Sequence, residues 1–110
     1  MIFRILVKGR VQGVNFREMV RRFCLGEGIF GSVRNCDDGS VEIHAQCGEG
    51  KKGKLVKWLK DSPGFSKVVD VEVEEVGSGE EFEGFEVIVE ENFFKDQKKA
   101  MGNLGRKLFG

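Results

Sequence analysis

The residues best suited to chemistry lie in one run, Lys8-Gly9-Arg10-Val11-Gln12-Gly13-Val14-Asn15-Phe16-Arg17. Its two glycines allow the main chain to turn tightly with N–H groups pointing inward. The first turn of a following helix would add unpaired N–H donors and the positive end of the helix dipole. Arg17 would lie in that turn, where a cation opposes the dipole at a cost of about 0.3–1 kcal/mol. A bound anion would offset this cost, so the run predicts an anion-binding site.

The same run has a plainer interpretation. A glycine turn followed by an arginine is often only a tight turn with a solvated side chain. Arg17 could also form an ion pair with Glu18 or with Glu27. Spacing alone leaves these alternatives open.

Composition limits the number of domains and the class of partner. At 110 residues, with 40% hydrophobic residues, the chain fits one domain with one ordinary core. The formal net charge is zero, which argues against a nucleic-acid binder that relies on a broad basic surface. Charge is nevertheless uneven, because residues 91–110 carry a net charge of +3 and the rest of the chain carries −3. We therefore divide the chain into a domain, residues 1–90, and a C-terminal basic extension, residues 91–110.

The N-terminal apolar run is interrupted by Arg4 and Lys8, so it does not resemble a signal peptide, and no run is long enough to span a membrane. We expect a cytoplasmic protein that does not associate with membranes. The three cysteines, Cys24, Cys36 and Cys47, have no metal-like spacing and fit a reducing compartment. Because His44 is the only histidine, a multi-histidine metal site is excluded. We expect neither a metal nor a cofactor.

Alternation of apolar and polar residues predicts strands, and apolar residues at helical spacing predict helices. The predicted strands are residues 2–8, 30–36, 40–47, 69–74 and 85–89. The predicted helices run from residue 16 to the glycines at 26 and 28, and over residues 49–60. Asn15 followed by Glu18 is typical of a helix N-cap with a capping box. Asp37-Asp38-Gly39 suits the turn of a β-hairpin.

The order of these elements is strand, helix, strand, strand, helix, strand, with a short extra strand. Two helices can cover only one face of the sheet, and the alternating strands require the other face to remain wet. This predicts the α+β class and a ferredoxin-like split βαβ sandwich. The expected sheet is antiparallel, with four strands plus the short one.

The extension has apolar residues near one helical face, interrupted by Gly102 and Gly105. It could pack on the domain, pack on a second copy, or be disordered, and a membrane-binding amphipathic segment is a weaker alternative because it is short and broken by glycines. We expect a monomer, with self-association through this extension as the alternative.

Two motifs resemble those of a known family. The run from Gly9 to Arg17 resembles the first signature of the acylphosphatase family, G-x-V-Q-G-V-x-[FM]-R. The segment Gly31-Ser32-Val33-Arg34-Asn35, followed by Asp38-Gly39-Ser40-Val41, resembles its second signature, G-aromatic-V-[RK]-N-x-x-[DN]-G-x-V. With the order of elements, the similarity covers roughly residues 2–89. We identify the chain as a member of this family.

The resemblance implies an enzyme that hydrolyses the carboxyl–phosphate bond of acyl phosphates to a carboxylate and inorganic phosphate, without a metal. It implies that Arg17 binds two phosphoryl oxygens and that Asn35 positions the attacking water. The main-chain N–H groups of one loop would surround the phosphoryl group: Gly9, Arg10, Val11, Gln12, Gly13 and Val14. These residue types suit the task, since a guanidinium matches phosphate as a rigid fork and an amide can accept from water while donating elsewhere.

The sequence departs from the family pattern at Ser32, where the family usually has an aromatic residue. We expect this change to reduce packing, with Phe30 filling part of the space, rather than to remove a catalytic group. A consequence would be lower stability or a shifted Asn35.

Two rival functions remain. A non-catalytic ferredoxin-like module that binds phosphorylated ligands would keep Arg17 but could dispense with Asn35. An RNA-binding domain of similar topology would need stacking aromatic residues on the open face of the sheet, and the central strands have none there. The presence of both Arg17 and Asn35 favours catalysis.

Overall fold

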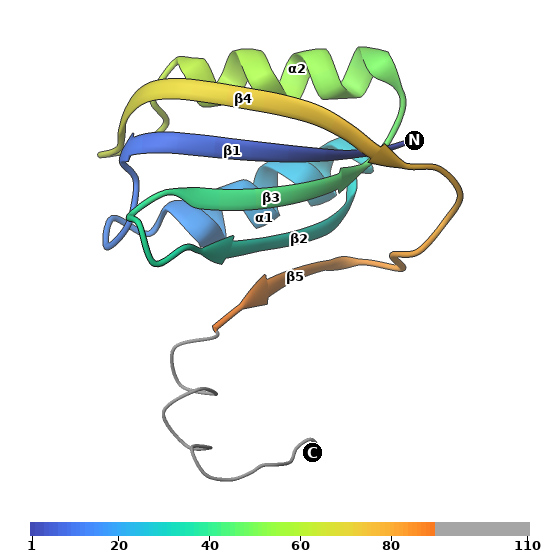
Figure 1. Ribbon diagram of the computed structural model, residues 1–110, viewed down its shortest axis with the longest axis horizontal. Coiled ribbons are helices and arrows are strands. Elements are labelled where there is room, and N and C mark those ends of the chain that lie inside the picture. Colours follow the sequence, from blue (N-terminus) through green and yellow to red (C-terminus); the bar gives the residue numbers. More distant parts are fainter. Residues whose placement is uncertain (90–110) are drawn as a thin grey trace, which may run out of the picture.

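The computed structural model describes residues 1–89, which form a five-stranded sheet with two helices packed on one face (Figure 1). The N-terminal half comprises β1 (Ile2–Arg10), α1 (Phe16–Glu27), β2 (Phe30–Asn35) and β3 (Val41–Gln46). It is followed by α2 (Glu49–Lys60), β4 (Lys67–Gly77) and β5 (Phe85–Ile88). The predicted ferredoxin-like fold is confirmed. The predicted extension from residue 91 onward lies outside the described residues.

The strands lie in the order β4-β1-β3-β2-β5. The four longer strands pair antiparallel, as predicted, but β5 runs parallel to β2, which makes the sheet mixed. Strand β4 is also longer than predicted and pairs with β1 along its whole length. This pairing places Lys67 opposite Arg10, at the same end of the sheet as the glycine run.

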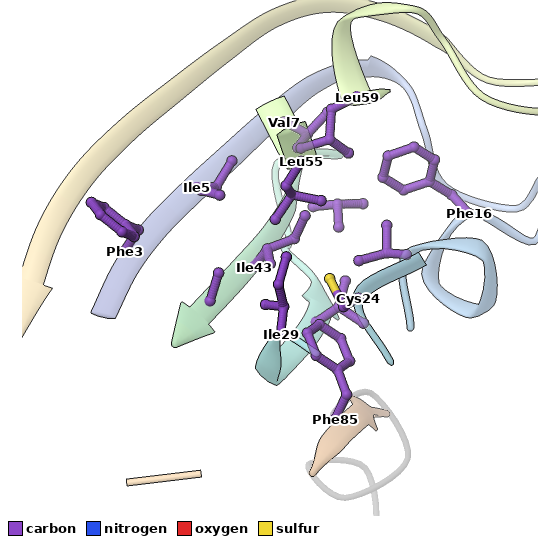
Figure 2. Close-up of a cluster of buried hydrophobic side chains, with 14 of the residues drawn as sticks. Phe3, Ile5, Val7, Phe16, Cys24, Ile29, Ile43, Leu55, Leu59 and Phe85 are labelled. Atoms are coloured by element: carbon purple, nitrogen blue, oxygen red, sulfur yellow. The ribbon is translucent and has the colours of Figure 1, made fainter. Parts of the chain in front are cut away.

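The core lies between the sheet and the two helices (Figure 2). Phe3, Ile5 and Val7 of β1 point into it at every second position, and Leu55 and Leu59 meet them from α2. The thiol of Cys24 is buried in the same cluster, and this burial raises its pKa to about 12. The three cysteines are free, and Cys24 acts as a small apolar core residue.

The opposite face of the sheet carries charged side chains in cross-strand pairs. Glu42 of β3 lies directly across from Arg34 of β2 and diagonally across from Arg4 of β1, which is itself opposite His44. Both arginines donate to it, Arg34 Nε to Oε1 at 2.7 Å and Arg4 Nε to Oε2. The Glu42 side chain is only 7% exposed as a result. The three charged side chains link β1, β3 and β2 on the face of the sheet that no helix of the described chain covers.

Ser32 lies on this face, directly across from His44. It is 6% exposed, so neighbouring groups already cover the position where the family has an aromatic residue. The ring of Phe82 lies 6.5 Å from that of His44, centroid to centroid. Phe30, which we expected to fill part of the space, is 37% exposed.

No helix among residues 1–89 is both long and apolar enough to cross a membrane.

Candidate active site

The glycine run forms the connection between the end of β1 and the start of α1. Gly9 has φ +133°, and a Cβ there would lie 2.1 Å from the Lys67 carbonyl oxygen, so only glycine allows β4 to approach so closely. Gly13 has φ +76° with open space around it, so glycine is favoured there by the backbone conformation of the turn and not by close packing. Between them Val11 is buried and anchors the loop to the core. The chain is thus held by β4 at Gly9 and by the core at Val11.

The loop and the first turn of α1 present free donors. The first helical hydrogen bond is from Met19 N to Asn15 O at 3.2 Å, so the N–H groups of residues 16–18 have no acceptor within the helix. Within the described part of the chain, the main-chain N–H groups of residues 12–15 also donate to no protein acceptor. Consecutive unpaired N–H groups beside a helix N-terminus form the kind of concavity that binds anions.

The predicted N-cap role of Asn15 and its capping box with Glu18 are wrong. The Asn15 side chain makes no capping hydrogen bond, and its backbone is left-handed, with φ 64° and ψ 23°. Glu18 does not complete a capping box either, because its carboxylate accepts from Arg21 at 2.9 Å and from Arg22 at 3.1 Å. Asparagine tolerates the left-handed region better than most residues, and this explains its presence.

Arg17 makes neither of the ion pairs that the plainer interpretation allowed. Glu18 is occupied by its helix neighbours, and Glu27 pairs with Lys54 at 3.1 Å. Within the described part of the chain, Arg17 Nη1 donates a hydrogen bond to the main-chain oxygen of Ile88, at 3.3 Å. Among residues 1–89 it has no carboxylate partner. No carboxylate of residues 1–89 therefore neutralises its charge at the helix N-terminus.

Asn35 ends β2 and lies beside the same loop. A pocket of about 170 Å³ is lined by Gly13, Asn15, Arg17, Asn35 and Val87, among others. The Asn35 Oδ1 atom is buried without a hydrogen-bond partner, the only such side-chain atom among residues 1–89. Buried polar atoms are nearly always paired, so an unpaired one in a residue that lines a pocket requires an explanation. The structure thus brings Arg17 and Asn35 together from separate signatures.

The predicted phosphate-binding residues divide into two sets. Val11, Gly13 and Arg17 line the pocket, whereas Gln12 and Val14 of the loop, and Gly9 and Arg10 at the end of β1, do not line it. Arg10 is exposed at the end of β1. The described residues contain no cluster of three His, Cys, Asp or Glu side chains that could hold a metal ion.

The hairpin turn after Asn35 is also well ordered by hydrogen bonds. Asp38 Oδ1 accepts from Ser40 Oγ at 2.6 Å and from Ser40 N at 3.0 Å. These bonds stabilise the carboxylate and lower the pKa of Asp38. The sequence identified the turn, but not the two hydrogen bonds from Gln12 Nε2 to the main-chain oxygens of Cys36 and Ser40 in this turn, or the contact between Arg17 and Ile88. Neither has a local signal, since each joins segments far apart in the chain.

Comparison with known proteins supports the resemblance to the acylphosphatase family that the two sequence motifs indicated. The acylphosphatase family model matches residues 3–87. The chain is similar to an acylphosphatase of Caldivirga maquilingensis, with 45% identity over 85 residues, covering 76% of this chain and 90% of the relative. It is also similar to an acylphosphatase of Bacillus licheniformis, with 42% identity over 85 residues, covering 77% of this chain and 94% of the relative.

The fold agrees with solved structures of the same kind. The crystal structure of acylphosphatase from Bacillus subtilis superposes with a TM-score of 0.75 at 40% identity, covering 81% of this chain and all of that one. The structure of an acylphosphatase from Coxiella burnetii gives a TM-score of 0.72 at 36% identity, covering 79% and 90% of the two chains. Motifs, topology and pocket therefore lead to one conclusion: this chain belongs to the acylphosphatase family.

Proposed function

We propose that the pocket between Arg17 and Asn35 carries out the acylphosphatase reaction of this chain, hydrolysis of a carboxyl–phosphate bond. The observation that carries the proposal is the buried Oδ1 of Asn35, which has no hydrogen-bond partner among residues 1–89, in a residue that lines the same pocket as Arg17. The substrate would be a small acyl phosphate, and the products a carboxylate and inorganic phosphate.

In the proposed reaction, the free N–H groups after β1 and the Arg17 guanidinium bind the phosphoryl oxygens. Asn35 Oδ1 accepts a hydrogen bond from a water molecule and thereby aims its oxygen at phosphorus. The P–O bond to the acyl group breaks as the water attacks, and the electron pair leaves with the carboxylate. The water's proton passes to a phosphoryl oxygen. Phosphoryl transfer of this kind depends on positioning and charge stabilisation, and a carboxylate leaves readily.

The charges around the pocket fit a reaction without a protein base. Glu18 lines the pocket, but its carboxylate is engaged by Arg21 and Arg22. Arg17 and Asn35 do not need to titrate near neutral pH for the roles assigned to them.

The choice between catalysis and simple binding depends on Asn35. A site that only binds phosphate needs hydrogen-bond donors, because phosphoryl oxygens are acceptors. The Oδ1 of Asn35 is an acceptor and would gain nothing from contact with those oxygens. An acceptor can instead bind a hydrogen of a water molecule, and this favours an enzyme over a non-catalytic phosphate-binding module.

The test is hydrolysis of benzoyl phosphate by the full chain, with and without a chelator. We expect turnover that the chelator does not reduce, together with competitive inhibition by inorganic phosphate. Phosphate binding without turnover would contradict the enzyme and support the binding module. Turnover that a chelator abolishes would contradict the metal-independent mechanism.

A further inference from the structure

The side chain of Gln12 does not line the pocket but joins the loop to the β2–β3 hairpin. Its Nε2 atom donates to the main-chain oxygens of Cys36 and Ser40, each at 2.9 Å. The side-chain oxygen of Gln12 cannot donate to a carbonyl oxygen, so the two acceptors determine the orientation of the amide. Both hydrogens of the group are used.

These two carbonyl groups form the base of the hairpin turn. Cys36 N donates to Ser40 O at 2.8 Å, and Gly39 N donates to Cys36 O at 3.1 Å. Cys36 directly follows Asn35 in the chain. Gln12 is therefore bonded to the residue next to Asn35 and to the residue that closes the turn. A shift of Gln12 relative to this turn would shift Asn35 as well.

The site needs such a link because its two halves come from different segments. The free N–H groups and Arg17 belong to the β1–α1 connection, whereas Asn35 is at the end of β2. Strands β1 and β2 are not neighbours, since β3 lies between them. Among residues 11–15 of the described structure, Gln12 alone donates side-chain hydrogen bonds to the hairpin.

We propose that Gln12 is a positioning residue, which sets the distance between the bound phosphoryl group and the water held by Asn35. The inference rests on the proposed function and deepens it. Its side chain acts through Asn35 and does not touch the substrate. Errors of about 1 Å in such a distance lower a rate by roughly 10²-fold.

The test uses Gln12→Met, which keeps the length of the side chain but loses both donors, and Gln12→Ala. We expect kcat for benzoyl phosphate to fall roughly 10²-fold in each variant, with a much smaller change in inhibition by inorganic phosphate. In an Asn35→Ala background the Gln12 substitutions should cost almost nothing more, because residues that act as one unit are not additive. An equal further loss in that background would overturn the proposal.

A matched control is available at the other end of the molecule. Gln46 makes a similar set of side-chain bonds, with Nε2 donating to Phe82 O at 3.2 Å and Oε1 accepting from Glu81 N at 2.7 Å and Phe82 N at 2.9 Å. Gln46→Ala should lower the thermal midpoint as Gln12→Ala does and leave kcat unchanged. A comparable loss of kcat in Gln46→Ala would show that the Gln12 effect is only one of stability.

A measurement that does not use turnover separates this inference from the proposed function. Amide hydrogen exchange of residues 36–40 should accelerate in Gln12→Met but not in Gln46→Ala. Unchanged exchange there would overturn the link itself. Accelerated exchange in a protein that hydrolyses no acyl phosphate would leave the link standing and refute the function instead.

Discussion

Arg17, in the first turn of α1, donates from Nη1 to the main-chain oxygen of Ile88 in β5, at 3.3 Å. This bond holds the guanidinium beside β5, whose Val87 lines the pocket, and uses one of its nitrogens. A guanidinium has five N–H donors, so enough remain for two phosphoryl oxygens. The short parallel strand β5 thus helps to orient the side chain on which phosphate binding depends.

Replacement of Arg17 should remove both phosphate binding and turnover. We expect Arg17→Ala to lower kcat/KM by on the order of 10³-fold, the lower range for an arginine that stabilises a transferred phosphoryl group. Arg17→Lys should recover little, because one ammonium cannot reach Ile88 O and two phosphoryl oxygens in a fixed geometry.

Benzoyl phosphate kinetics and phosphate inhibition measure this effect, and Arg22→Ala is the control. Arg22 lies on the same helix with its side chain 72% exposed and paired with Glu18. The Arg22→Ala substitution should leave both kcat/KM and inhibition by phosphate unchanged. Full activity in Arg17→Lys would show that only the charge matters and not the fork.

Asn35 should separate binding from turnover. Asn35→Ala removes the acceptor for water but leaves the donors in place, so we expect near-normal inhibition by inorganic phosphate and a kcat lower by roughly 10²–10³-fold. Asn35→Asp places a carboxylate beside the phosphoryl group and should weaken phosphate inhibition as well, by like-charge repulsion. Collapse of phosphate binding in Asn35→Ala, with turnover retained, would reverse the roles given to the two residues.

The sequence predicted the parts of this site that depend on local pattern. Alternating residues located the strands, and the glycine run and the Asp38-Gly39 turn located both loops. It could not predict the contact between Arg17 and Ile88, which are 71 positions apart, or the bonds from Gln12 to the hairpin, 24 and 28 positions away. Such contacts depend on strand order and on β5 running parallel to β2, and no local signal encodes either.

Asn15 shows how a local rule can fail within a correct fold. The spacing of Asn15 and Glu18 fits a capping box, which requires an extended N-cap residue. The tight turn from Gly13 instead places Asn15 at φ 64°, so its side chain cannot cap, and Glu18 pairs with later residues of the helix. The geometry of the loop overrides the propensity of the helix start.

The two interpretations of Asn15 predict opposite orders of stability. If Asn15 must be left-handed, the free energy of unfolding of Asn15→Gly should lie within about 0.5 kcal/mol of the wild-type value. That of Asn15→Ser should be lower than wild type by roughly 1 kcal/mol. A capping role would favour serine over glycine instead. Urea unfolding of the three proteins gives the order, and a serine variant as stable as wild type would contradict the left-handed account.

Glu42 should make the free energy of unfolding depend on pH in the acid range. Its burial alone would raise the pKa of its carboxyl group, but the hydrogen bonds from Arg4 and Arg34 outweigh burial and lower this pKa below the usual 4.5. A lowered pKa in the folded state means that the folded protein binds fewer protons than the unfolded chain. The stabilising contribution of Glu42 is therefore complete above pH 4.5 and is lost as the pH falls through the lowered value.

Glu42→Gln keeps the shape of the side chain but removes its charge. We expect a free energy of unfolding lower by about 1–3 kcal/mol near neutral pH, because two charge-assisted bonds are weakened in a largely buried position. The difference from wild type should shrink below pH 4.5, where Glu42 of the unfolded chain becomes protonated. Glu72→Gln is the control, since Glu72 and Lys8 form an exposed pair with side chains 55% and 45% accessible. Urea titrations across the acid range would contradict this account if the Glu42→Gln difference stayed constant with pH, or if Glu72→Gln lost as much stability.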